Sequence, residues 1–265
     1  MRLIKQLFNK IGATWWSAIV SIFIIFILVF FHFRKIEPFP WSDFICNIAT
    51  ELLGITFTIV FVDKLFNRYD KIKAKREESE KIARMHNLAF FYIKQYMYHL
   101  HSITTPMEKK FQGEIKLETP FSLQDLQYLY TPTLLVTESF RQTSIEYFFQ
   151  YEQEVKQAFI NMLNTINFEF YPDLSKIIQD FIHVSTKFYA RAVILDNVNI
   201  KTFSETFVNM LKGDDIYEKY DEYKKNELKA NGIMPYFMLY DMLKEEQKIL
   251  SSYISEMKKI DAEYH

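Results

Sequence analysis

The feature that most constrains this chain is an uncharged, strongly apolar run at residues 13–33. From Ala18 to Phe31 only Ser21 interrupts the apolar side chains. About 20 helical residues, at 1.5 Å each, match the ~30 Å hydrocarbon core of a bilayer. The run is too long for the apolar region of a signal peptide, and no small-residue cleavage site follows it. It therefore predicts a transmembrane helix that is not cleaved.

A second, less uniform apolar segment follows at residues 44–66. Only about ten residues, including Pro38 and Pro40, separate the two segments, which is too few for a domain. The two segments therefore predict an antiparallel transmembrane hairpin. Indole rings prefer the headgroup region of a bilayer, and all the tryptophans lie at predicted span ends. We expect them to be membrane-interface anchors: Trp15, Trp16 and Trp41.

The distribution of Lys and Arg predicts the orientation of the hairpin. Three basic residues precede the first span, two lie in the loop, and eight lie between Lys64 and Arg84. Basic residues accumulate on the cytoplasmic side, so both termini are expected in the cytoplasm and only the short loop outside. The expected organisation is a basic N-terminus at 1–12, the hairpin at 13–66, a helical stalk at 67–84 and a cytoplasmic helical bundle at 85–265.

The second predicted span carries a polar stripe. At 100° per residue, Asn47, Glu51, Gly54 and Thr58 fall within about 60° of one helix face. A carboxylate inside a bilayer must be paired, protonated or hydrated. The stripe thus predicts an interhelical hydrogen-bonded contact, the lining of a pore built from several copies, or a proton or ion relay. The contact and the pore both require a homo-oligomer, because one hairpin cannot cover that face.

Beyond the stalk, apolar residues recur with helical period and no strand-like alternation persists. Five Gly and seven Pro in 265 residues leave few turns. An all-α bundle is therefore expected. The apolar pattern predicts one helix over 145–166, one from Pro172 to about Leu195, a shorter one over 201–212 that Gly213 ends, and a last one over 235–262 with near-heptad spacing. Ser122 and Asp125 resemble the capping box of a further short helix.

The sequence offers little for catalysis or for cofactors. It has no phosphate-binding glycine loop, no HExxH, GxSxG or CxxC motif, and a single cysteine. From residue 85 onward, 19 basic residues face 25 acidic ones, which disfavours nucleic acid as a partner. We therefore expect no enzymatic site, no cofactor and no metal. The expected partners are the lipid bilayer, further copies of the chain, and a protein or small ligand that acts on the bundle.

The segment NIATELLGITFTIVFVDKLFNR, at residues 47–68, resembles the second span of a class of bacterial proteins with two N-terminal spans and a helical cytoplasmic domain. Some of these two-span proteins are effectors of anti-phage systems, including retron-linked ones. The resemblance implies that Glu51 and Gly54 matter for function. It implies nothing about the soluble domain.

Together these features favour an oligomeric inner-membrane effector. Its cytoplasmic bundle would receive a signal and change the packing of the second spans, so that the membrane is perturbed or permeabilised. The alternative hypothesis is a membrane-anchored scaffold or binding protein, in which the stripe only holds the oligomer and the bundle recruits a cytosolic partner.

Overall fold

The structure, a computed structural model, describes residues 26–27, 42–109, 115–131, 143–199, 201–213, 215–227 and 232–263. It is 84% helical, and the described residues contain no β-strand, which confirms the all-α prediction. Apart from Phe26 and Ile27, which are helical, the predicted first span lies outside the described residues. So do the predicted anchors Trp15, Trp16 and Trp41.

Among the described residues, no helix combines the length and the apolar character needed to cross a bilayer.

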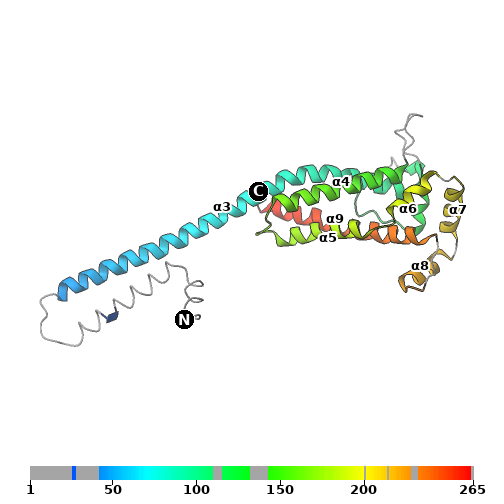
Figure 1. Ribbon diagram of the computed structural model, residues 1–265. Helices are drawn as coiled ribbons and strands as arrows, with labels where there is room; N and C mark the ends of the chain where they lie inside the picture. The colour runs from blue at the N-terminus through cyan, green and yellow to red at the C-terminus, as the bar shows by residue number, and fades with distance from the viewer. Residues whose placement is uncertain are drawn as a thin grey trace. The chain divides into compact units, whose positions relative to one another are not determined.

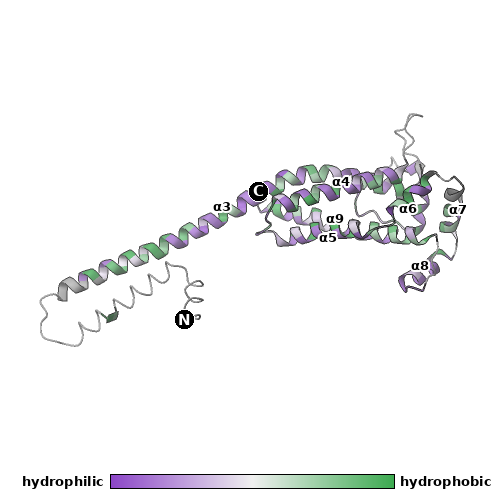
Figure 2. Cartoon of the chain, viewed as in Figure 1, coloured by the Kyte–Doolittle hydropathy of each residue, from purple (hydrophilic) through white to green (hydrophobic). Residues whose placement is uncertain are grey.

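The longest element is α3, an uninterrupted helix of 63 residues from Ser42 to Thr104. The sequence explains its length, because no Gly or Pro follows Gly54 within the helix. Hydrophobic residues dominate its early turns and hydrophilic residues the following ones (Figure 2). The chain divides into two compact units, residues 1–76 and 77–265, and α3 contributes to both.

The second unit is a bundle of long helices. The part of α3 from Glu77 onward runs alongside α4 (Ser144–Thr165), α5 (Pro172–Lys187) and α9 (Met234–Ala262) (Figure 1). Aromatic side chains from all four helices fill the centre of this bundle. Phe159 packs edge-on against Phe181 with ring centroids 5.3 Å apart, and Tyr96 lies 5.1 Å from Phe148.

Shorter elements close one end of the bundle (Figure 1). The Ser122–Asp125 capping box is present, since the Asp125 carboxylate accepts hydrogen bonds from the Ser122 backbone N–H at 2.6 Å and from its hydroxyl at 2.8 Å. The helix that it opens is a 3-10 helix. The short elements are η1 (Met107–Lys109), η2 (Leu123–Tyr128), α6 (Arg191–Asp196), η3 (Asn197–Asn199), α7 (Lys201–Lys212) and α8 (Ile216–Lys224).

The prediction of one helix from Pro172 to about Leu195 is wrong for its last third. α5 ends at Lys187, Phe188 takes an extended backbone conformation, and α6 begins at Arg191. Phe188 stacks on Phe149 of α4, with ring centroids 6.0 Å apart, so packing between helices overrides the continuing apolar period. The near-heptad positions of α9 are all buried in the bundle: Leu239, Leu243, Leu250, Tyr253, Met257 and Ile260.

Candidate functional site

The polar stripe predicted from the sequence lies on the part of α3 that belongs to the first unit. Asn47, Glu51, Gly54 and Thr58 are all helical, so their spacing sets them on one face. Each of them is exposed in the single chain. Glu51, Gly54 and Thr58 line a shallow groove of about 420 Å³ together with Ile55 and Ile59.

The local geometry of the stripe leaves room for a neighbour. A Cβ atom added to Gly54 would meet no atom within 4 Å. The Thr58 hydroxyl donates to the Gly54 carbonyl oxygen at 2.8 Å, a bond within the same helix that leaves the groove open. Among the described residues, nothing therefore packs against this position closely enough to require a glycine. A glycine on an exposed helix face instead permits close approach by another helix.

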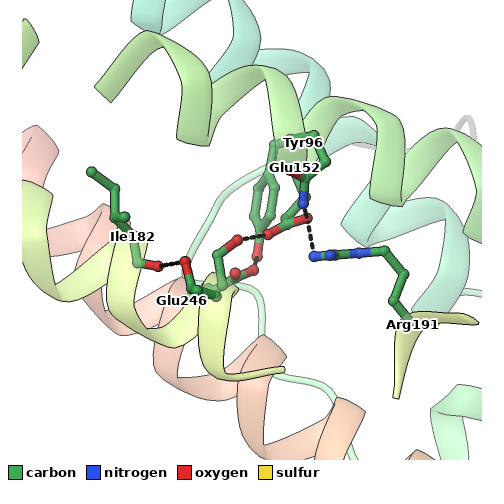
Figure 3. Close-up of polar contacts among 8 residues, drawn as sticks. Tyr96, Glu152, Ile182, Arg191 and Glu246 are labelled. Atoms are coloured by element: carbon green, nitrogen blue, oxygen red, sulfur yellow. Dashed lines mark hydrogen bonds and ion pairs between the residues drawn. The ribbon is translucent and has the colours of Figure 1, made fainter. Parts of the chain in front are cut away.

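A second polar site lies inside the bundle, centred on Glu152 of α4. Its side chain is fully buried and accepts three hydrogen bonds. Arg191 of α6 donates at 2.6 Å and Gln153 at 2.9 Å, both to Oε2, and Ser185 of α5 donates to Oε1. Figure 3 shows the Arg191 guanidinium reaching the Glu152 carboxylate. The Glu152 carboxylate thus links α4 to α5 and α6 through hydrogen bonds.

Glu246 of α9 is the second carboxyl group of this cluster. It is fully buried, and its Oε2 accepts a hydrogen bond of 2.9 Å from the Tyr96 hydroxyl of α3 (Figure 3). Its Oε1 has no hydrogen-bond partner among the described residues. Burial, and then the negative charge of Glu152, raise the pKa of Glu246 well above its usual range. The environment of Glu246 therefore favours its protonated form.

Arg191 supplies the positive charge of the cluster. Its guanidinium carbon lies 5.1 Å from the centre of the Phe149 ring and 5.9 Å from that of Phe188, and its side chain is 25% exposed. The cation thus lies over two aromatic rings, while its Nη2 donates to the Glu152 carboxylate. One cation faces two carboxyl groups, so the arrangement is electrically balanced when one carboxyl keeps its proton.

Sequence reasoning missed this buried cluster, although a signal was present. Glu152 lies four residues after Phe148 and three before Val155, at an apolar-stripe position. Glu246 likewise falls between Leu243 and Leu250. A charged residue in such a position predicts a buried partner. Nothing in the pattern names that partner, since Arg191 comes from a separate helix.

Neither of these two sites resembles a metal centre, and no known protein assigns a function to them. In the described part of the chain, no three His, Cys, Asp or Glu side chains are grouped so that they could hold a metal ion. No protein-family model matches the chain, and no curated protein and no solved structure is detectably similar to it.

Proposed function

We propose that this chain is an oligomeric inner-membrane effector that perturbs or permeabilises the membrane when its cytoplasmic bundle is triggered. The observation that carries the proposal is the continuity of α3. Its first part exposes the polar stripe around Glu51, and its last part contributes Ile82, Ile93 and Ile103 to the bundle core. A continuous helix resists local bending, so a shift in the bundle can reach the stripe.

The membrane anchor in this proposal rests on the sequence. The uncharged run at 13–33 is long enough to span a bilayer, and residues 44–66 supply the returning helix. In that arrangement Glu51 lies roughly 10 Å below the outer surface, at 1.5 Å per residue. A carboxyl group at that depth is costly and is retained where it serves assembly or conduction.

The trigger is a protein partner or a small ligand that binds the bundle. The resemblance of residues 47–68 to two-span effectors suggests that phage infection supplies it. Opening then follows from a change in the packing of the stripes of several copies, either by lining an aqueous path or by disordering the lipid around them.

The test is the membrane potential of bacteria that express the chain, followed with a voltage-sensitive dye before and during phage challenge. Glu51→Gln and Thr58→Val should suppress depolarisation, because the first removes the ionisable carboxyl group of the stripe and the second removes a hydroxyl group from it. Thr56→Val is the matched control. It is the same substitution two residues away, about 200° around the helix, and should leave depolarisation intact.

Membrane insertion of each variant is checked by fractionation. Well-inserted wild-type protein that never depolarises the cells, with or without phage, contradicts the effector and favours the anchored scaffold. Depolarisation that persists in both stripe variants contradicts a role for the stripe. Suppression by Thr56→Val to the same extent shows that the effect is not specific to one face.

A further inference from the structure

The polar stripe of α3 continues along the same helix face into an apolar one. Leu65, Tyr69 and Ile72 follow Thr58 with spacings of seven, four and three residues. At 100° per residue, these three fall within the same arc of about 60° as Asn47 and Glu51. The whole series, from Asn47 to Ile72, lies in one unbroken helix and in one unit of the chain.

The apolar half of this face is exposed. The side chains of Leu65, Tyr69 and Ile72 are 50%, 65% and 69% exposed. Between Asn67 and Arg76 the only other apolar residue is an alanine. Tyr69 and Ile72 therefore stand alone among charged and polar neighbours, on the side where the stripe lies. Apolar residues of this kind on an otherwise polar stretch of helix indicate a helix–helix contact.

We propose that Asn47, Glu51, Gly54, Thr58, Leu65, Tyr69 and Ile72 form one continuous seam at which a second copy of this chain packs, parallel and in register. The proposal rests on the proposed function in one respect. Anchoring every copy in the membrane with the same orientation makes neighbouring copies parallel.

The chemistry of the seam is self-complementary, which is why a second copy is its occupant. An amide both donates and accepts hydrogen bonds, so Asn47 can pair with the same residue of an identical helix in register. Gly54 and Thr58 allow two backbones to approach closely. Leu65 and Ile72 then bury apolar surface against their own counterparts.

The spacing of the seam fits a coiled contact. Glu51, Thr58, Leu65 and Ile72 recur at intervals of seven residues, the repeat that keeps one helix face against its partner in a left-handed coiled coil. Asn47 and Ile72 are 25 residues apart, so the contact can run for about 38 Å at 1.5 Å per residue.

The experiment is cysteine cross-linking of the full chain in native membranes. The background is Cys46→Ser, which removes the only native thiol. Single cysteines at the seam positions Leu65, Tyr69 and Ile72 are compared with cysteines at Asn67 and Ala74. The last two are exposed and lie about 170° from the centre of the seam. A mild oxidant then forms disulfides only where two copies present the same face to each other.

We expect several-fold more disulfide-linked dimer at the three seam positions than at the two control positions. Equal cross-linking at all five positions, or a maximum at Asn67 and Ala74, overturns the proposal. Monomer at every position also overturns the proposal, and would mean that another segment or lipid covers this face. As a second arm, Ile72→Asp should lower cross-linking through Tyr69→Cys, whereas the matched Asn67→Asp should not.

This outcome is separable from that of the proposed function. Seam-specific dimers in cells that never depolarise support the seam and contradict the effector. Depolarisation without seam-specific dimers supports the effector and contradicts the seam.

Discussion

At the scale of single residues, the buried cluster in the bundle brings two carboxyl groups, Glu152 and Glu246, to one guanidinium group, that of Arg191. Glu152 accepts a hydrogen bond from Arg191, whereas Glu246 accepts one from the Tyr96 hydroxyl, and its Oε1 has no hydrogen-bond partner among the described residues. Burying a second carboxylate beside Glu152 is costly, so burial and the Glu152 charge raise the pKa of Glu246. The packing of α3, α4 and α9 thus depends on the protonation of one side chain.

Glu246→Gln should make the stability of the bundle less sensitive to pH. The pKa of Glu246 is raised in the folded chain, so its stabilising contribution is complete below the pKa of an unfolded Glu, about 4.3. That contribution is lost as the pH rises through the folded pKa. Glutamine stays neutral, so the variant should gain free energy of unfolding relative to wild type as the pH rises.

At acidic pH the two proteins should differ by no more than about 1 kcal/mol, the value of one hydrogen bond. The measurement is denaturant unfolding of the full chain in detergent across a pH series. Glu245→Gln is the matched control, because Glu245 is the exposed neighbour on the same helix. Parallel pH curves for wild type and Glu246→Gln would contradict a raised pKa at Glu246.

Part of the buried cluster could be predicted from the sequence. Glu152 and Glu246 lie on apolar stripes, and this position predicts that each is buried with a partner. The partner of Glu152 is 39 residues away on α6 and depends on the bend after α5. Local periodicity carries no information on that bend, so the cluster emerges only once the helices are packed.

At the scale of helices, the strongly periodic segments were predictable. The apolar stripes over 145–166 and 235–262 give α4 and α9 within about two residues of the observed ends. The segment from Pro172 to Leu195 is different. Its pattern is compatible with one helix, but Phe188 and Ala190 are buried in a non-helical turn. Contacts from other helices decide such a break, and a single-segment pattern does not include them.

The α3 seam predicts an unusual response to salt. Arg68 and Lys73 lie on opposite sides of the seam, each about 70° from its centre and five residues apart. In a parallel pair, residues related in this way face each other across the contact, so the two copies bring like charges together. Screening weakens that repulsion. Disulfide formation through Tyr69→Cys should therefore increase with salt concentration.

Arg68→Glu reverses the charge at one of these two positions and is tested in the same cross-linking measurement. It converts the repulsion into an attraction, so cross-linking should become stronger at low salt and fall as salt is added. Loss of cross-linking with added salt in the unmodified seam would show instead that an anion, such as a lipid headgroup, bridges the copies.

At the scale of the whole molecule, the all-α class follows from the sequence, since few glycines and prolines and a persistent helical period exclude most alternatives. The order of the helices follows as well. The core does not, because pairs such as Tyr96 with Glu246 join residues 150 positions apart. The membrane hairpin and its role remain predictions. The second predicted span and the first helix of the bundle are parts of the same helix, α3.

The proposed mechanism requires α3 to act as a rigid connection, which makes function depend on helical phase. Two alanines inserted between Arg76 and Glu77 turn the seam by about 200° relative to the bundle, whereas seven turn it by about −20°. The insertion site is the boundary between the two compact units. The two-residue insertion should abolish phage-triggered depolarisation, and the seven-residue insertion should retain most of it although it lengthens the helix more. Equal depolarisation by both variants would mean that α3 is only a tether, and that the bundle acts on the membrane without turning the seam.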